Sequence, residues 1–560
     1  MQKIWKIKPS NNIDQKKLAR ELGVSPILAQ ILINRGINNS ADAQKYLNCD
    51  LNDLHDPFLL KDMSLAVKRI KKAIKLKEQI VIYGDYDVDG VTSCSVLFNT
   101  LKQLNAEVSC YIPHRVDEGY GLNTQACAKI KQQGAALIIT VDCGINAFEQ
   151  VDYLNSVKLD VIITDHHQPA DDVPRALAVI NSLQKDCNYP YKNLAGVGIA
   201  YKLACALIGP EQDISVHLDL VALGTICDVA LLTGENRIFV KHGLERLSQT
   251  KKIGLQALKQ VAGIANRKIE AYHVGFILGP RINATGRMGS AAKALELLLS
   301  EDYAQALILA QALDAENKLR KKEEAKTLRQ ALAMVDREVN FKTDKAVVLH
   351  NDDWHPGVIG IVASRITERF YRPTILISTK GEIGKGSGRS IRNFHLFDTI
   401  AKCEHLLEGF GGHKKAAGLS ILKDNLPEFK KLFNEIAFNC LNPEDMMPVI
   451  NIDMQIPVSD LSEELINEIE KCAPFGMGNT RPLFSSVDLN LKGASRALRA
   501  NSFKMWITDG KITCEALASN FSDIDINHIN NGFSIVYSPA INDWQGINTL
   551  QLKLKDMKLA

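Results

Sequence analysis

The sequence lacks the features that would place the protein outside the cytosol. Its 12 cysteines are scattered singly, with no Cys-x-x-Cys pair, and several lie inside apolar runs. This usage is typical of buried thiols in a reducing compartment, and it disfavours disulfides and zinc knuckles. The first residues have no apolar core of a signal peptide, and no apolar run approaches membrane-spanning length. We therefore expect a cytoplasmic protein with no membrane partner.

A strong charge of either sign is also missing. The 560 residues carry 67 Lys and Arg against 64 Asp and Glu, a net charge of +3. Any nucleic-acid partner must therefore be held by a local basic face. Apolar residues make up 46% of the chain and charged residues 23%, as in ordinary globular proteins. The length predicts about three or four domains.

Glycine and proline are absent between Gly289 and Pro356. Residues 302–339 are rich in helix formers, and a continuous helix over them would span roughly 55 Å. We interpret this helix as a strut that connects two domains. A coiled-coil dimerisation arm is the alternative, although the apolar residues hold no clean heptad.

The most informative stretch that is present covers residues 80–90. A short apolar run ends there in three aspartates at alternate positions, Asp85, Asp87 and Asp89. Carboxylates this close repel one another unless a cation lies between them, and hard oxygen ligands suit Mg²⁺, Mn²⁺ or Ca²⁺. An EF-hand loop begins in the same way, but it needs a preceding helix and a Glu where this chain has Val96. An ordinary polar turn is a further alternative; we favour a catalytic metal site.

From residue 79 the pattern alternates between strand and helix. The predicted strands are 80–83, 107–112, 136–141 and 161–164, and such apolar strands joined by helices indicate a parallel sheet covered on both faces. Polar residues gather after the carboxyl ends of these strands, which is the edge where ligands bind in open α/β sheets. These residues are Asp85, Asp87 and Asp89 after the first strand, Asp142 after the third, and Asp165, His166 and His167 after the fourth.

Asp228 stands alone in an apolar stretch, residues 216–230, that we predict to be helical. A carboxylate in such surroundings needs a partner, and a capping or salt-bridged aspartate is the structural alternative to a metal ligand. Together with the residues at the sheet edge, it could hold two divalent ions that share a bridging carboxylate. The mostly oxygen ligand set favours Mn²⁺ or Mg²⁺ over structural Zn²⁺. We expect Asp165 to orient an imidazole.

A second α/β region begins at Ala346. It contains Trp354-His-Pro-Gly and two glycine-rich segments, 384–390 and 409–418, which we interpret as turns. Glycine-rich turns that carry Arg, Lys, Ser and His can surround a phosphate with N–H groups and cations. These segments therefore predict an anion-binding cradle.

After residue 443 the pattern changes again. A turn-rich connector, residues 472–484, precedes short strand-like segments at 503–508, 533–537 and 549–554. A small β-barrel of the OB type fits this pattern, and such barrels often bind single strands through basic grooves and aromatic platforms. Trp506, Tyr537 and Trp544 are candidate platforms, although aromatic residues of small barrels more often belong to the core.

These motifs resemble those of the DHH phosphoesterase superfamily. The resemblance lies in Gly-Asp-Tyr-Asp-Val-Asp-Gly, Val-Asp142-Cys-Gly, Thr-Asp165-His-His and the later Asp228, and the segment around His413 resembles the companion DHHA1 domain. More narrowly, the chain resembles the RecJ family of single-strand-specific 5′→3′ DNA exonucleases. The supporting segments are Ile112-Pro-His-Arg115, the glycine- and arginine-rich run 279–289, Trp354-His-Pro-Gly and the connector before the OB-like tail. Thr480 departs from this pattern, because the resemblance leads us to expect Pro there.

The resemblance implies an α/β fold with a specific domain order. We expect an N-terminal helical region (1–60), a parallel-sheet DHH domain (61–300), a long connecting helix (301–340), a second α/β, DHHA1-like domain (341–445), and a connector with an OB-like β-barrel (446–560).

The resemblance also implies roles for individual residues. The metal ligands are Asp85, Asp87, Asp89, Asp142, His166 and Asp228. The catalytic group is His167, which contacts the scissile phosphate, with Asp142 and Asp165. The residues that grip the strand and its 5′ phosphate are Arg115, Arg281, Arg287, His355, Ser387, Arg389 and His413. The sequence does not say which of Arg281 and Arg287 reaches the strand.

We therefore predict a monomeric enzyme, dependent on two Mn²⁺ or Mg²⁺ ions, that hydrolyses single-stranded DNA from its 5′ end to mononucleotides in DNA repair and recombination. A single-strand-binding protein and a helicase are the expected protein partners. Two alternatives stay open: a DHH-family phosphodiesterase of very short oligonucleotides, cyclic dinucleotides or 3′-phosphoadenosine phosphate, and a non-catalytic replication scaffold. A phosphodiesterase of this kind needs only the two α/β domains, so the N-terminal region and the C-terminal tail argue against it. A non-catalytic scaffold would have little need to keep all the metal ligands, and this chain has the full set.

Overall fold

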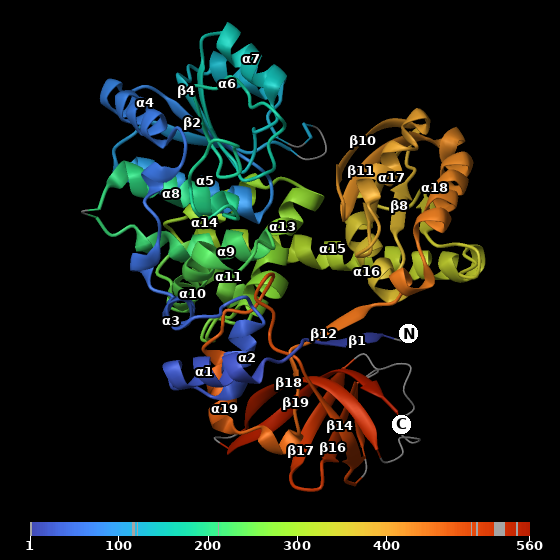
Figure 1. Ribbon diagram of the computed structural model, residues 1–560. Coiled ribbons are helices and arrows are strands. Elements are labelled where there is room, and N and C mark those ends of the chain that lie inside the picture. Colours follow the sequence, from blue (N-terminus) through green and yellow to red (C-terminus); the bar gives the residue numbers. More distant parts are fainter. Residues whose placement is uncertain are drawn as a thin grey trace.

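The structure is a computed structural model that describes residues 3–114, 118–119, 121–210, 212–493, 495–499, 502–519, 532–544 and 547–559. Figure 1 shows a parallel-sheet domain at the top, a helical layer below it, and a long helix that leads to a second α/β domain at the right. A β-rich C-terminal domain lies at the bottom, beside the N-terminal helices. Among the described residues, no helix has the length and apolar composition required to cross a lipid bilayer.

The first sheet is parallel, as predicted, and has the strand order β3-β2-β4-β5-β6. Its strands are β2 (Ile80–Gly84), β3 (Val108–Tyr111), β4 (Leu137–Val141), β5 (Asp160–Thr164) and β6 (Ala178–Ile180). Helices α4 (Met63–Leu76) and α5 (Val88–Gln103) share a core with one face, and α6 (Thr124–Gln132) and α7 (Phe148–Ser156) share a core with the other. Every residue of β2 and β4 is buried, because helices cover both faces.

A helical layer extends the same core. It contains α8 (Gly196–Ile208), α9 (Leu218–Cys227), α10 (Gly234–Ser248), α11 (Ile253–Val261), α12 (Ala271–His273), the π-helix η4 (Val274–Leu278), α13 (Gly279–Met288) and α14 (Ala292–Leu299). The prediction of a helix through residue 230 was wrong at its end. Helix α9 stops at Cys227, and Val229 adopts a left-handed φ of 61°. Asp228 is therefore the C-terminal cap of the helix and does not lie in its interior.

The predicted strut is one continuous helix, α15 (Tyr303–Glu338), of 36 residues. Asp302 caps its start by accepting a hydrogen bond from the Gln305 amide at 2.7 Å. The helix is about 54 Å long at 1.5 Å per residue. Its first part packs against α11, α13 and α14, and its last part packs against α16 (Pro356–Phe370) of the second domain. The two α/β domains are thus joined by a rigid element (Figure 1).

The second domain is built on a mixed sheet of order β10-β11-β9-β8-β7. Its elements are β7 (Val347–Asn351), β8 (Thr374–Ser378), β9 (Ile383–Arg389), α17 (Leu396–Ala401), β10 (Leu407–His413), β11 (Ala416–Leu422) and α18 (Leu426–Cys440). The prediction of glycine-rich turns was wrong for residues 384–389, which belong to β9. It holds only at Lys414 and Lys415 of the second segment, the turn that joins β10 to β11. The glycines of β9 serve packing: a Cβ at Gly386 would lie 2.7 Å from the Leu419 Cδ1 atom, and one at Gly388 would lie 2.9 Å from the Leu396 Cδ2 atom.

The C-terminal domain is OB-like, as predicted. Its sheet runs β13-β14-β18-β19-β17-β16-β15, and an additional pairing of β14 with β16 brings the sheet back on itself. The strands are β13 (Met454–Gln455), β14 (Phe484–Leu491), β15 (Arg496–Arg499), β16 (Ser502–Thr508), β17 (Thr513–Ser519), β18 (Phe533–Trp544) and β19 (Ile547–Lys558). Of the candidate platforms, Trp506 is 43% exposed, whereas Tyr537 is fully buried and belongs to the core. The side chain of Trp544 lies outside the described part of the structure.

The N-terminal region packs on the C-terminal domain. Helices α1 (Asn12–Leu22), α2 (Pro26–Ile33) and α3 (Ser40–Asn48) agree with the predicted helical character, but Ile4–Ile7 forms strand β1. Strand β1 pairs in parallel with β12 (Val449–Ile452) near the other end of the chain. Leu28 and Leu32 of α2 share a core cluster with α19 (Glu463–Glu470) and the barrel. Residues 1–60 therefore have no separate core of their own among the described residues.

Candidate active site

The loop after β2 gathers the first carboxylates. Asp87 caps α5 by accepting hydrogen bonds from the amides of Asp89 and Gly90, at 2.9 and 3.2 Å. Gly90 packs against the Asp85 backbone so closely that a side chain there would clash. The carboxylate of Asp89 accepts from the amides of Gly196 and Val197, at 2.7 and 2.9 Å. The sequence Asp-x-Asp-x-Asp-Gly thus folds into a strand end, a helix cap and a link to α8.

The ends of β4 and β5 add the next ligands. Asp142 follows β4 with a left-handed φ of 60° and is 2% exposed. His166 follows β5, and its Nε2 atom lies 3.1 Å from the Asp142 Oδ1 atom. A Cβ at Gly196 would lie 2.8 Å from that same Asp142 oxygen, so only glycine leaves room for the carboxylate. Asp228, at the end of α9, has its Oδ2 atom 3.9 Å from the His166 Nδ1 atom.

The predicted ligands form three overlapping groups, and within each group the ligand atoms lie within 4.8 Å of one another. The groups are Asp85, Asp87 and Asp142; Asp89, His166 and Asp228; and Asp142, His166 and His167. Asp142 and His166 each belong to two groups. All six residues that the sequence predicts as metal ligands therefore converge, and the overlap at Asp142 suits a carboxylate shared between two ions.

The electrostatics of the cluster favour a bound cation. Burial, followed by the negative charges of Asp89 and its neighbours, raises the pKa of Asp142 well above its ordinary value. Burial likewise raises the pKa of Asp228 to about 7. Burial lowers the pKa of His166, but the carboxylates of Asp228 and Asp89 outweigh burial and raise it. A pair of divalent cations would relieve this concentration of buried negative charge, and the oxygen-rich donor set fits Mn²⁺ or Mg²⁺.

Asp165 holds the second histidine in place. Its Oδ1 atom accepts from the amides of His166 and His167, at 2.7 and 3.0 Å, and lies 2.7 Å from the His167 Nδ1 atom. Its Oδ2 atom accepts from the Ile145 amide at 2.9 Å. Burial would raise the pKa of Asp165, but the hydrogen bond with His167 outweighs burial and lowers it, so the carboxylate stays ionised. Nδ1 is therefore the protonated nitrogen, and Nε2 lies on the opposite edge of the ring.

Helix α13 joins the metal loop to the second domain. The Asn283 Oδ1 atom accepts from the Val88 amide at 3.2 Å, directly after Asp87. The Arg287 Nη1 atom lies 3.4 Å from the Gly357 carbonyl oxygen at the start of α16 and donates to it. The Arg281 guanidinium pairs with Asp314 of α15 at 3.0 Å. Of the two arginines, Arg287 thus lies at the domain junction, and Arg281 fastens α13 to the long helix.

The second domain places its polar residues on one face of the sheet. His413, Ala416 and Arg389 are paired across β10, β11 and β9, and cross-strand partners share a face. The Arg389 Nη1 atom donates to the Ser387 hydroxyl at 3.2 Å. Burial and then the charge of Arg389 lower the pKa of His413. A Cβ at Gly411 would meet no atom within 4 Å, so this face is open at the edge strand β10. At β9 it is covered by α16, where a Cβ at Gly360 would lie 2.8 Å from the Ser387 Oγ atom.

His355 and Arg115 are the remaining residues predicted to contact the DNA, and the structure describes only His355. The His355 Nδ1 atom caps α16 by accepting from the Gly357 amide at 3.0 Å, beside the junction with Arg287. Arg115 lies outside the described residues. Asn283 was not among the predicted site residues, although it lies in the run 279–289 that carries the resemblance. Its role depends on a contact with Val88 that is distant in sequence, and no local pattern indicates that contact.

Comparison with known families agrees with this architecture. Residues 79–225 match the DHH family, N-terminal domain, residues 343–438 match the DHHA1 domain, and residues 452–556 match the RecJ OB domain. A single-stranded-DNA-specific exonuclease RecJ of Bacillus subtilis (strain 168) is 41% identical over 557 residues, which cover 99% of this chain and 70% of the relative. The RecJ exonuclease of Escherichia coli (strain K12) is 34% identical over 482 residues, which cover 82% of this chain and 83% of the relative.

Solved structures give the same result. The crystal structure of RecJ from Thermus thermophilus in complex with Mn²⁺ matches with a TM-score of 0.86 and 29% identity, and the match covers 100% of this chain and 80% of that one. The Mg²⁺ complex from the same organism matches with a TM-score of 0.80 and 28% identity, covering 100% and 78%.

Proposed function

The chain belongs to the RecJ family of single-stranded-DNA-specific exonucleases, and from this premise we propose how its site degrades a strand. It is a metal-dependent exonuclease that acts on single-stranded DNA. We propose that it works from the 5′ end and releases mononucleotides. The observation that carries this proposal is the convergence of six predicted ligands into overlapping groups. The domain that holds them is linked through Arg287 to the second domain, which carries Arg389.

The metal ligands would be Asp85, Asp87, Asp89, Asp142, His166 and Asp228. When bound there, Mn²⁺ or Mg²⁺ supplies Lewis-acid chemistry that lowers the pKa of a water and neutralises charge on a phosphoryl group. Asp89 is fixed by two amides of α8, and Asp87 is fixed by two amides of α5. These bonds hold the carboxylate oxygens in position before substrate arrives, which limits the reorganisation needed during the reaction.

His167 is the residue we assign to the phosphoryl oxygens. Burial lowers the pKa of His167, but the hydrogen bond and charge of Asp165 outweigh burial and raise it. Asp165 thereby stabilises the protonated imidazole and fixes its orientation. An Nε2–H directed at a non-bridging phosphate oxygen would stabilise the additional negative charge that develops during hydrolysis.

The cationic face of the second domain is the proposed site of the 5′ phosphate. Arg389, Ser387 and His413 lie there, and the face is open at Gly411 on the edge strand β10, so backbone and phosphate can approach closely at that edge. His355 and Arg287 lie at the junction that leads from this face to the metal loop. A terminal phosphate held at this face would fix the number of nucleotides between the 5′ end and the metals.

Several further properties follow as proposals. We propose a processive, monomeric enzyme in DNA repair and recombination, with a channel between the two α/β domains that excludes duplex. A single-strand-binding protein and a helicase would supply its substrate. All 12 cysteines lie among the described residues and are free thiols, which supports a reducing compartment such as the cytoplasm.

Digestion of 5′- and 3′-labelled single and double strands, with Mn²⁺ and with Mg²⁺, tests the proposal. A 5′-labelled single strand should release labelled mononucleotide at once, and Asp142→Ala should abolish release. Asp171→Ala is the matched control, because Asp171 is a fully exposed acid in the loop after the histidines. Release of label from the 3′ end first would refute the polarity. A preference for dinucleotides would instead indicate a short-oligonucleotide phosphodiesterase, and absence of hydrolysis would indicate a scaffold.

A further inference from the structure

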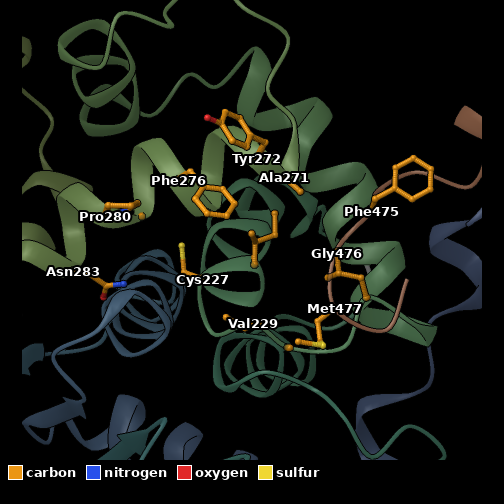
Figure 2. A pocket seen from close by; sticks show the side chains of 15 residues that line it. Cys227, Val229, Ala271, Tyr272, Phe276, Pro280, Asn283, Phe475, Gly476 and Met477 are labelled. Carbon is orange, nitrogen blue, oxygen red and sulfur yellow. The ribbon is translucent and has the colours of Figure 1, made fainter. Parts of the chain in front are cut away.

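A pocket of about 500 Å³ lies next to the metal cluster (Figure 2). Three segments form its walls: the end of α9 with the residues that follow it, from Ile226 to Leu232; α12, the π-helix η4 and the start of α13; and residues 475–477 of the connector. In Figure 2 the rings of Tyr272 and Phe276 lie on one side, and Val229 and Met477 lie on the other. The volume is in the range of ligand pockets, roughly 300–1,000 Å³, and the lining is mainly apolar.

Two aromatic side chains are exposed at this pocket. Phe276 is 70% exposed and Tyr272 is 61% exposed, and their rings stack with centroids 5.2 Å apart at an interplanar angle of 26°. Val229 and Met477, on the opposite wall, are also exposed. Contiguous exposed apolar surface usually marks a binding site, because leaving it in water costs free energy. Phe276 also belongs to the π-helix η4, and π-helical turns occur frequently at functional sites.

The pocket and the metal cluster share structural elements. Asp228, a predicted metal ligand, lies in the chain between Cys227 and Val229, which both line the pocket. Asn283 also lines the pocket, and it accepts the hydrogen bond from Val88 in the loop that carries Asp87. The pocket wall and the metal ligands are therefore carried by the same helix ends, Cys227–Val229 and the start of α5.

We propose that this pocket binds nucleobases of the single strand on the 3′ side of the scissile bond, with Phe276 as the stacking platform. The inference rests on the proposed nuclease function. The 5′ phosphate is assigned to the second domain, which contacts the metal-binding domain through Arg287 and Gly357. The pocket is instead completed by the connector that leads into the OB-like domain, so we assign it to nucleotides on the 3′ side. Stacking is tolerant of sequence because every base has a π face, as an enzyme that removes all four nucleotides requires.

The connector is held in place to complete this pocket. The Met477 carbonyl accepts a hydrogen bond from the Leu232 amide at 2.7 Å. A Cβ at Gly476 would lie 2.6 Å from the Leu232 Cδ1 atom, so glycine permits the close approach. The Phe-Gly-Met segment thus contributes a wall of the active-site region in addition to linking two domains.

Single abasic sites, placed in turn at the second to sixth nucleotide of a 5′-labelled strand, test the proposal by single-turnover kinetics with Mn²⁺. In the wild type, an abasic site at one or two positions should slow cleavage by about 5- to 150-fold, from the usual strength of base–aromatic stacking. Phe276→Ala should slow cleavage of the intact strand by a similar factor and lose its sensitivity to those positions. Phe276→Tyr should retain most activity, and Phe276→Leu, which keeps apolar volume, should behave as the alanine variant does.

Controls separate this inference from the nuclease assignment. Phe58→Ala removes a phenylalanine of similar type that is 49% exposed elsewhere in the chain, and it should leave the abasic-site profile unchanged. Mn²⁺ binding and thermal stability of the Phe276 variants should equal those of the wild type. If wild-type enzyme cleaves the strand but Phe276→Ala keeps the full wild-type abasic-site profile, the pocket inference is wrong and a protein ligand becomes the better occupant. If the wild type cleaves no strand, the proposed function itself fails.

Discussion

Replacing Asp165 with asparagine removes the charge that orients His167 and keeps the size of the side chain. The carboxylate is 1% exposed, and its two oxygens serve three amides and the His167 Nδ1 atom. Asparagine has one acceptor oxygen, so its NH₂ group must face either the Ile145 amide or the three N–H groups that Oδ1 serves. The first orientation leaves one buried donor unpaired and the second leaves three, so Asp165→Asn should adopt the first.

The magnitude follows from these contacts. An unpaired buried donor costs about 1–3 kcal/mol, so the free energy of unfolding should fall by this amount. Groups that orient a catalytic or metal-binding histidine usually contribute roughly 10- to 100-fold to activity, and we expect kcat to fall within that range. Mn²⁺ affinity should change less, because His166 and the aspartates keep their positions.

The pH dependence gives an independent readout. Burial lowers the pKa of His167 and Asp165 raises it above its ordinary value, so the proton that His167 donates is lost as pH rises through that raised pKa. Without the Asp165 charge the pKa of His167 falls. The alkaline decline of kcat should therefore begin at lower pH in Asp165→Asn than in the wild type.

The assay is kcat and KM on a 5′-labelled single strand from neutral to alkaline pH. Asp171→Asn, in the exposed loop after the histidines, is the matched control and should behave as the wild type does. His167→Ala and the double variant complete a cycle, in which Asp165→Asn should add little to His167→Ala. An unchanged pH profile would refute the role of Asp165. So would a double variant whose loss of kcat equals the product of the losses in Asp165→Asn and His167→Ala.

Three further predictions concern metal binding, the packing of the second sheet and the binding of single-stranded DNA. Burial raises the pKa of Asp228 to about 7 when no metal is bound, so protons compete with Mn²⁺ for this carboxylate. The Mn²⁺ affinity, measured by calorimetry, should therefore rise as the pH increases through about 7. An affinity that does not depend on pH would contradict this. Gly386→Ala adds a methyl group to a packed face and should lower stability to denaturant by about 1–3 kcal/mol, whereas Gly409→Ala, where a Cβ meets no atom within 4 Å, should not. Arg389→Ala should weaken strand binding and reduce the slope of log affinity against log salt by about 0.7, measured by anisotropy in the Asp142→Ala background; an unchanged slope would exclude a phosphate contact.

The sequence predicted the first sheet and the gathering of acidic residues at one of its edges, for a physical reason. Strands buried on both faces must be apolar along their whole length, so β2 and β4 are visible as continuous runs, and the aspartates that follow them are conspicuous. Strand β6 was missed because three residues carry too little pattern. The long helix α15 was predicted because 36 residues without glycine or proline leave few alternatives.

Features that depend on distant contacts were not predictable. Strand β1 exists through its pairing with β12, and four residues show no local strand pattern. The glycines of β9 were interpreted as turn residues, whereas tertiary packing against Leu419 and Leu396 requires their lack of a side chain. The exposure of Phe276 beside the metal site arises from the arrangement of α9, η4 and the connector, which no single segment specifies.

The number of Mn²⁺ ions bound per chain, determined by equilibrium dialysis and elemental analysis, tests the two-ion centre most directly. The wild type should bind two ions, and Asp142→Ala should bind one or none, because Asp142 belongs to two of the three ligand groups. Asp171→Ala should still bind two. A wild type that binds no ion at this cluster, or an Asp142→Ala variant that retains both, would contradict the account.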